Sequence, residues 1–555
     1  MKLDLDLITN YSASQIADTI RDGDVKAIDV LKAMRISAEK SSKYNAVVQF
    51  LDDYSTEKAE KIDEQIAQGV KFSKEEYPLL GVPISVKDCY GIKGYENTIG
   101  LDRFKGVINE KTNPLIEALE KSGAIPFCTT HVSQFMGTIG STNSHGITYN
   151  PYSEKYTAGG SSSGEGALIG SDGSILGIGG DIGGSIRIPA SFCGIYGLKP
   201  TPRRLFGVGE RIITPGQEAV VAATGPLAKH VEDLDVMVKA VLNSNPWETA
   251  HDVVPIPYRE ATLPKKLRIG YYLDDGKYPT TPACERAVMM AVEALKAAGH
   301  DVFPYHEPAI KGASDLYSKL AGMDKSRPKH EALLPHEKMT IENTNMAFLH
   351  KLPTWVAWIV CKVLSGILGE KGYSEVVWDF ITADTNTMFK LVSEREDKEK
   401  KSFEAWSNAI DENGATMDFV ICPISPMPSF EHHTFVEVGV AYGNNFLYNL
   451  IGNTVGVIPV SRVNREIDGI EDLSSWLKSK VSEDYSEKFF LQKLIYSQYD
   501  AHEMHGLPVA IQVVGRKFEE EKVAKGMELI DKILKEYDQP NKYTTYSQYK
   551  KENLN

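Results

Sequence analysis

Hydrophobic and polar positions alternate along most of the chain in a way that predicts strands separated by helices. Short apolar runs at 124–128, 265–272, 301–303, 419–423 and 506–512 have strand length. Between them, Thr281 and Pro282 open a helix that Gly299 closes, and a second helix from Pro114 stops at Gly123. This alternation predicts an α/β fold with a mixed or parallel sheet that helices cover on both faces.

The two ends of the chain are predicted to be helical. A capped helix begins near Ser12 and ends at Gly23, and helical spacing then continues to about residue 70. We therefore expect residues 1–70 to form an N-terminal helical arm. The last helix is expected over 518–537, with an apolar face that packs on the sheet: Val523, Met527, Ile530 and Leu534.

The most hydrophobic segment of the chain is 346–369. Only about fifteen of its residues lie between Pro353 and Gly369, and Lys362 is one of them, whereas a membrane-spanning helix needs about 20 apolar residues. Two interpretations of this segment remain: a helix in the protein core and a helix at a membrane interface. Periodicity alone favours the core helix, while the interfacial helix would place Trp355 and Trp358 at the depth of lipid headgroups.

The segment 461–505 is polar and charged, and we expect it to be a surface insertion between two strands. His502 and His505 lie in it, but their spacing is not H-x-x-x-H and no third ligand is nearby. A metal site is therefore not expected.

Composition narrows the class of protein. A chain of 555 residues with 42% hydrophobic and 25% charged residues is an ordinary soluble globular protein, and its net charge of −14 argues against a nucleic-acid partner. The six cysteines are scattered with no C-x-x-C pair, and the N-terminus has no apolar signal segment. Reduced thiols in the cytoplasm are therefore expected.

Candidate chemistry is concentrated in the stretch 157–200, where apolar runs interrupt glycines and serines. A flexible linker does not return to a core pattern in this way. A buried glycine-rich backbone indicates a close approach to the main chain or a positive φ. Ser185 directly follows Gly183 and Gly184, whose N–H groups can face a carbonyl oxygen, so Ser185 is the better candidate for a nucleophile.

A base for this serine is offered by the strand-like run 81–88, which carries Lys87 among apolar residues. An apolar setting disfavours the ammonium ion and lowers the pKa of a lysine from about 10.4 toward neutrality, so that its amine can accept a proton. The competing interpretation is a surface lysine whose stem alone is covered.

Together, the runs GVPISVKD, GGSSSGEG and GDIGGSIRIP resemble the amidase-signature hydrolases in order and spacing. The resemblance implies a single large domain with a central twisted mixed sheet, in which 71–555 is the catalytic part, and no cofactor. It implies that Lys87 is the base, Ser161 a bridging serine that relays the proton, and Ser185 the nucleophile. Further residues are implied at the substrate: the amides of Ile182, Gly183, Gly184 and Ser185 around the oxyanion, and Met136 beside the scissile carbonyl.

The order of elements after Pro200 looks like the fatty-acid amide hydrolase branch of that family. In that branch a hydrophobic cap, here 346–369, lies in one membrane leaflet beside an acyl channel. The resemblance therefore implies a lipid amide such as an N-acylethanolamine as substrate, and a homodimer. The chain lacks the N-terminal transmembrane helix of the animal enzymes, so contact with an intracellular membrane would be peripheral.

Several competing interpretations of the same residues stay open. Ser162 matches G-x-S-x-G, but an α/β-hydrolase needs a strand before it, and 154–157 is not expected to be one. A general short-chain amidase is a further candidate. Acidic charge and the apolar cap disfavour the amidase-family subunit of a tRNA-dependent amidotransferase, and the intact triad disfavours an inactive lipid-binding relative. Asp181 and Arg187 either orient the nucleophile loop or form a local salt bridge.

Overall fold

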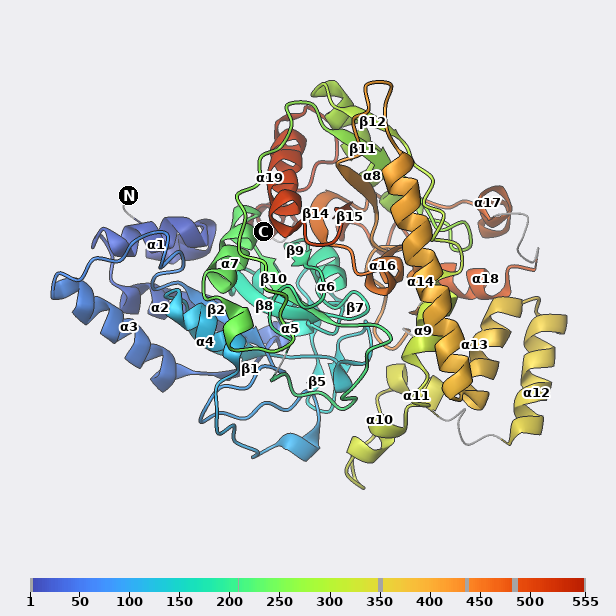
Figure 1. The fold of residues 1–555 in the computed structure, drawn as a ribbon, viewed down its shortest axis with the longest axis horizontal. Helices are drawn as coiled ribbons and strands as arrows, with labels where there is room; N and C mark the ends of the chain where they lie inside the picture. The colour runs from blue at the N-terminus through green and yellow to red at the C-terminus, as the bar shows by residue number, and fades with distance from the viewer. Residues whose placement is uncertain (1–2, 208, 348–352, 435–438, 482–487, 554–555) are drawn as a thin grey trace.

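A mixed 11-stranded sheet forms the centre of the computed structural model, which describes residues 3–207, 209–347, 353–434, 439–481 and 488–553 (Figure 1). In spatial order its strands are β1 (Val47–Phe50), β3 (Ile125–Thr130), β2 (Pro83–Lys87), β8 (Leu176–Asp181), β10 (Ala223–Ala228), β9 (Tyr196–Lys199), β14 (Val455–Arg462), β15 (Pro508–Val514), β13 (Phe419–Pro423), β11 (Arg268–Tyr271) and β12 (Asp301–Pro304). The α/β fold with a mixed sheet, predicted from the alternating pattern, is confirmed.

The helices of the first half of the chain are α1 (Ala13–Arg21), α2 (Ala27–Lys40), α3 (Asp52–Ala67), α4 (Pro114–Lys121), α5 (Ser163–Gly170), α6 (Arg187–Phe192), α7 (Glu232–Leu242) and α8 (Pro282–Ala297). Those of the second half are α9 (Ala313–Ala321), α10 (Arg327–Ala332), α11 (Ile341–Ala347), α12 (Thr354–Lys362), α13 (Lys371–Thr382), α14 (Thr385–Asn408), α16 (Gly443–Leu450), α17 (Leu473–Lys480), α18 (Phe490–Tyr496), α19 (Glu520–Glu536) and α20 (Tyr546–Asn553).

Helices cover both faces of the sheet, and two glycines on paired strands show this. Gly197 pairs with Val457, while Gly456, the residue before Val457, pairs with Leu198. Successive residues of a strand point to opposite faces. A Cβ on Gly197 would meet Ala190 of α6, and a Cβ on Gly456 would meet Met527 of α19. α6 and α19 therefore lie on opposite faces.

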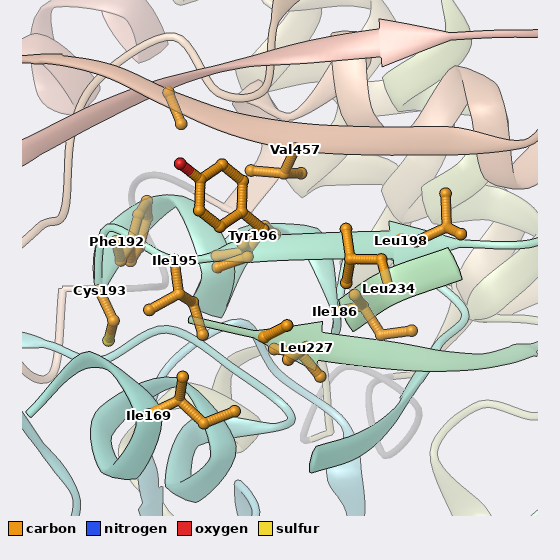
Figure 2. Packing of buried hydrophobic residues seen from close by; sticks show 14 of the residues in the cluster. Ile169, Ile186, Phe192, Cys193, Ile195, Tyr196, Leu198, Leu227, Leu234 and Val457 are labelled. Atoms are coloured by element: carbon orange, nitrogen blue, oxygen red, sulfur yellow. The ribbon is translucent and has the colours of Figure 1, made fainter. Parts of the chain in front are cut away.

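Apolar side chains fill the layer between α5, α6 and the middle strands (Figure 2). Figure 2 shows Ile169 of α5, Ile186 at the start of α6 and Leu227 of β10 in this layer, and all three side chains are buried. Strands β13 and β15 are buried at every position, which explains why their sequences are apolar runs.

The N-terminal segment 1–70 is not exclusively helical. α1 has the expected capping box, in which Gln15 N donates to Ser12 Oγ and Ser12 N donates to Gln15 Oε1. Between α2 and α3, however, the chain forms β1, which pairs antiparallel with β3 at the edge of the sheet. The purely helical interpretation of this segment was wrong because a short, half-buried edge strand carries little periodic signal.

The apolar segment is a surface element, so the core interpretation of 346–369 was wrong. Part of it, 348–352, lies outside the described residues; α12 and a π-helical turn (Val363–Ile367) follow. Trp355 is 68% exposed and Ile367 64% exposed. In Figure 1 α12 lies at the end of the molecule opposite the N-terminal helices. Within the described residues, no helix has the length and apolarity needed to span a bilayer.

The segment 461–505 is more than a surface insertion. Its residues form α17 and α18, and several of their apolar side chains are buried, including Leu477, Ile495 and Tyr496. Tyr496 donates to the carbonyl of Pro279 at 2.5 Å and so fastens the insertion to the loop before α8. The apolar face predicted for the helix at 518–537 is confirmed, since Val523, Met527, Ile530 and Leu534 of α19 are all buried. It was wrong to expect this helix to be the last one, because α20 follows it.

Candidate active site

Three sequence motifs meet at one edge of the sheet. Lys87 is the last residue of β2, Ser161 precedes α5, and Ser185 lies between β8 and α6. β2 and β8 are parallel neighbours, so their carboxyl ends lie at the same edge, where α/β folds commonly place their sites. Ser162 N donates to Ser185 O at 3.3 Å, which joins the two serine loops through the backbone.

Lys87 lies inside the protein and close to Ser161. Its side chain is 2% exposed, and Nζ lies 2.9 Å from Ser161 Oγ and 3.3 Å from the Gly180 carbonyl oxygen. Burial lowers the pKa of Lys87, while nearby ionisable groups raise it less. An uncharged amine at this place can accept a proton from the Ser161 hydroxyl.

The loop that carries Ser161 is packed tightly against the preceding loop. A Cβ on Gly160 would overlap the carbonyl oxygen of Gly140, so only glycine fits there. Ser133 N donates to Ser161 O at 3.2 Å, and the Gly160–Ser161 peptide bond is cis. Among the described residues, no hydrogen bond joins the hydroxyls of Ser161 and Ser185.

The nucleophile loop is crowded on both sides. A Cβ on Gly183 would overlap the Tyr317 hydroxyl, and one on Gly184 would overlap the Asn445 side-chain amide and lie 2.6 Å from Ile188 Cδ1. Gly184 also has a φ of +102°, a conformation that side chains rarely adopt. Both glycines are therefore required by close approach.

The expectation that the Gly184 amide faces the oxyanion is not met. Gly184 N donates to Asp181 Oδ1 at 2.8 Å, because the tight turn after β8 points this amide back at the carboxylate. Within the described chain, no protein acceptor occupies the amides of Ile182, Gly183 and Ser185. These three amides are available to a carbonyl oxygen.

Asp181 and Arg187 form a buried ion pair beneath this loop. Arg187 Nε donates to Asp181 Oδ2 at 3.0 Å, and both side chains are fully buried. Burial by itself raises the pKa of Asp181, but the Arg187 guanidinium more than offsets this and holds the pKa well below its usual range. Arg187 also donates to Gln512 Oε1 at 2.8 Å and Asn449 Oδ1 at 2.6 Å, so the pair ties the loop to β15 and α16.

Ser162 is placed differently from the other two serines. Its hydroxyl oxygen is buried without a hydrogen-bond partner, and no base contacts it among the described residues. One argument against it was wrong, because β7 (Ser153–Thr157) is a strand; it pairs with β6 (Tyr149–Asn150) in a two-stranded sheet outside the central one. Local pairing across a tight turn makes this polar segment extended.

Met136 lies in the loop after β3 that contacts Gly160. Phe135 and Met136 both have positive φ, 62° and 55°, and such strained residues cluster at functional sites. Gln134 anchors the loop, since its Nε2 donates to Ser144 Oγ at 3.1 Å and its Oε1 accepts from Thr340 N at 2.7 Å. Met136 is partly buried against the core.

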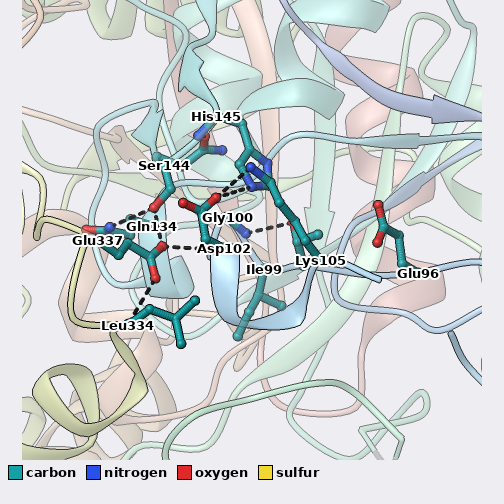
Figure 3. A network of polar contacts seen from close by, with 12 residues as sticks. Glu96, Ile99, Gly100, Asp102, Lys105, Gln134, Ser144, His145, Leu334 and Glu337 are labelled. Atoms are coloured by element: carbon teal, nitrogen blue, oxygen red, sulfur yellow. Dashed lines mark hydrogen bonds and ion pairs between the residues drawn. The ribbon is translucent and has the colours of Figure 1, made fainter. Parts of the chain in front are cut away.

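A polar network around Glu337 extends this anchor (Figure 3). Glu337 accepts from Asp102 N at 2.8 Å and from Ser144 Oγ. Asp102 in turn pairs with Lys105 at 2.6 Å and with His145 at 3.6 Å. The network joins the Met136 loop to the segment before α11, which leads to the apolar helix α12.

Two aromatic residues at this site, Tyr317 and Phe446, were missed by the sequence reasoning. Their rings stack with centroids 4.0 Å apart, and Tyr317 points its hydroxyl at Gly183. They come from α9 and α16, more than a hundred positions from the nucleophile, so no local motif could identify them. No cluster of three or more candidate metal ligands occurs among the described residues.

Known amidases are similar to this chain over most of its length. A family model described as Amidase matches residues 29–524. Fatty acid amide hydrolase 1 of Caenorhabditis elegans is 32% identical over 543 residues, which cover 95% of this chain and 88% of that protein. An acetamidase of Emericella nidulans is 30% identical over 537 residues, with coverage of 95% and 90%. A solved structure of a fatty acid amide hydrolase superimposes with a TM-score of 0.81 at 25% identity and covers 96% of this chain and 87% of that one.

Proposed function

The chain belongs to the amidase family and is an amide hydrolase, and from that premise we propose that it cleaves fatty-acid amides such as N-acylethanolamines through an acyl-enzyme on Ser185. The observation that carries the catalytic part is the buried Lys87 amine, whose pKa is lowered by burial and whose Nζ lies 2.9 Å from Ser161 Oγ, beside a loop of unoccupied amides. The family resemblance stated from the three motifs is confirmed.

In the proposed first step, Ser185 Oγ forms a bond to the amide carbon. Its proton passes to Ser161 Oγ while the Ser161 proton passes to Lys87 Nζ, which becomes an ammonium. The carbonyl electrons move to oxygen, where the amides of Ile182, Gly183 and Ser185 stabilise the charge. The relay needs the two serine hydroxyls within reach of each other, and catalytic hydrogen bonds commonly tighten only when substrate binds.

In the second step, the oxyanion re-forms the carbonyl and the bond to nitrogen breaks. The Lys87 ammonium returns its proton through Ser161 to the leaving amine. Water then attacks the acyl-enzyme and gives a proton along the same route, and Ser185 leaves as the acid is released. Every proton taken up is returned, so no cofactor is required.

The lipid part of the proposal is supported by the exposed apolar helix α12. Trp355, Trp358 and Ile359 are 68%, 54% and 46% exposed. We propose that this surface makes a peripheral contact with an intracellular membrane, from which a lipid amide enters the site. A homodimer is proposed from the family resemblance alone, and light scattering tests it.

A second candidate is a short-chain amidase, because the acetamidase relative is nearly as similar as the fatty acid amide hydrolase. Turnover of oleamide and oleoylethanolamide, compared with acetamide and benzamide, separates the two. Long chains are expected to give the higher kcat/KM. Equal or better hydrolysis of acetamide would favour the short-chain enzyme, and Ser185→Ala should abolish turnover of every substrate.

Membrane contact has its own test. The double change Trp355→Ser with Trp358→Ser should lower co-flotation with anionic lipid vesicles and leave hydrolysis of a water-soluble amide unchanged. Phe403, which is 62% exposed on α14, provides the matched control Phe403→Ser. If wild type does not float, or both variants float equally, the membrane proposal fails while amide hydrolysis stands.

A further inference from the structure

A chain of hydroxyl groups leads from the neighbourhood of Lys87 to the carboxyl group of Glu210. Thr224 Oγ1 lies 3.0 Å from Glu210 Oε1, and the Tyr90 hydroxyl lies 3.0 Å from Thr224 Oγ1. Tyr90 and Thr224 are buried, and Glu210 is partly buried. The backbones of Tyr90 and Glu210 also form an isolated β-bridge, which holds the segment around Glu210 over the end of β2.

This chain ends on the same backbone that holds the Lys87 amine. The Tyr90 hydroxyl donates to Gly179 O at 3.1 Å, and Lys87 Nζ lies 3.3 Å from Gly180 O, the next carbonyl of β8. Thr224 pairs with Gly180 across the sheet. A Cβ on Gly180 would be 3.4 Å from the Tyr90 hydroxyl and 3.8 Å from Lys87 Nζ, so the two groups lie on the same side of β8.

Four ionisable groups raise the pKa of the Lys87 amine, of which Cys89 has the largest effect, followed by Glu210, Asp181 and Glu165. Asp181 is neutralised by Arg187. Glu165 accepts from Ser85 Oγ at 2.6 Å and Thr130 Oγ1 at 2.7 Å, and burial raises its pKa to about 7. Cys89 is a buried thiol whose pKa is raised by burial. Of the three carboxyl groups, Glu210 has the strongest effect on Lys87.

Lys87 is in turn the charged group that most favours the ionised form of Glu210. Burial raises the pKa of Glu210, and Lys87 comes first among the groups that lower it, before Thr224 and Tyr90; Asp252 has a weaker, opposite effect. A carboxyl group that faces neutral hydroxyls and one amine responds to the charge of that amine. An ammonium at Lys87 therefore makes the Glu210 carboxylate more favourable, and the converse holds as well.

We propose that Glu210 is a positioning residue that stabilises the Lys87 ammonium formed when Ser185 attacks, with Thr224 and Tyr90 holding its carboxylate in place. This inference rests on the proposed role of Lys87 as the base. The proton moves from Ser185 through Ser161 to Lys87, and Glu210 keeps its negative charge throughout. The arrangement gives the lysine the kind of electrostatic support that a buried aspartate gives the histidine of a serine protease.

The pH dependence of the reaction tests this role. Lys87 must be unprotonated to act, so the acid limb of the kcat/KM profile follows its pKa. A neighbouring carboxylate raises the pKa of an amine, so Glu210→Gln should move the acid limb to lower pH, by about one pH unit. The weaker base and less stabilised ammonium should lower the plateau rate by about tenfold. Glu210→Asp should keep the acid limb near its wild-type pH and should retain most of the plateau rate.

The measurement follows hydrolysis of an acyl p-nitroanilide, or the rate at which a fluorophosphonate labels Ser185, from about pH 5 to about pH 10. Glu307→Gln is the matched control, because Glu307 is also a buried carboxyl that accepts from a hydroxyl, Ser402 Oγ at 2.9 Å, but does not face Lys87. Its profile should match that of the wild type. Thr224→Val, which removes only the hydroxyl link, should shift the acid limb in the same direction as Glu210→Gln but less.

The outcomes distinguish a failure of the proposed role of Glu210 from a failure of the proposed role of Lys87 as the base. A Glu210→Gln profile that superimposes on the wild type overturns the inference while the mechanism stands. If that variant does not fold, a Thr224→Val profile identical to the wild type has the same meaning. If Lys87→Met is labelled at the wild-type rate, the base itself is misassigned and both proposals fail.

Discussion

Adding one methyl group at Gly183 tests whether the nucleophile loop is held by Tyr317. Gly183 does not have a positive φ, so its backbone allows alanine. The new Cβ would overlap the Tyr317 hydroxyl and lie 2.9 Å from Tyr317 Cζ, whereas carbon atoms in contact are normally about 3.5–4.0 Å apart. Either the ring or the loop must therefore move by about half an ångström or more.

The cost of this movement depends on which part gives way. Overpacking a buried site costs about 1–3 kcal/mol in stability. Tyr317 is held by its stack on Phe446, so we expect the loop to move. The amide N–H groups of Ile182, Gly183 and Ser185 would then no longer point at the oxyanion. Loss of one oxyanion donor lowers kcat by about 10²- to 10³-fold, so Gly183→Ala should lower kcat/KM by about 10²-fold with a small decrease in Tm.

A double-mutant cycle with Tyr317→Ala gives the assay its control. Once the ring is removed, the same methyl group should cost less than about tenfold, which corresponds to a coupling energy above about 1 kcal/mol. Gly469→Ala, where a Cβ meets nothing within 4 Å, should leave activity unchanged. The reasoning is refuted if Gly183→Ala is fully active, or if its cost is equal in both backgrounds.

Three more outcomes are expected from buried polar groups. Asp181→Asn leaves Arg187 without its counter-charge and should lower the free energy of unfolding by about 3–5 kcal/mol in urea titrations, whereas Arg203→Gln, at an exposed pair, should change it by less than about 1 kcal/mol. His131 is buried, and its pKa is lowered to about 4. Because the unfolded state binds the proton first, stability should fall as the pH drops from about 6.5 to 4, by about 3 kcal/mol, and His131→Gln should flatten this slope. Ser162→Ala should keep fluorophosphonate labelling, and loss of labelling would revive the G-x-S-x-G interpretation.

Local signals in the sequence predicted many of the strands and the cap at Ser12 correctly, but they missed β1 and β7. The capping box at Ser12 and the apolar face of α19 depend on neighbours within one or two turns, so spacing alone identifies them. Lys87 could be singled out because it was the one charged residue in a run that the sheet buries on both faces. The proximity of Lys87, at the end of β2, to Ser161 could be predicted only from the family resemblance, because β2 and α5 are far apart in the sequence.

Tertiary contacts determined what the sequence could not predict. The segment around Trp355 and Trp358 has an amino-acid composition typical of a core helix, but both side chains are largely exposed. The hydropathy of a segment does not show whether its side chains are exposed. The direction of the Gly184 N–H group depends on the path of the turn after β8, which points this group at Asp181. Tyr317 reaches the site from an element separated by a long stretch of chain, and no motif marks it.

The proposed role of a neutral Lys87 amine acting on Ser185 is tested most directly by the pH dependence of fluorophosphonate labelling, with the modified residue identified by mass spectrometry. The wild type should carry the adduct on Ser185, at a rate that rises with pH through an apparent pKa below that of a free lysine, about 10.4. Lys87→Met should lower the rate by at least about 10²-fold and remove this dependence. An adduct on a different serine, or equal labelling rates in the two proteins, would contradict the account.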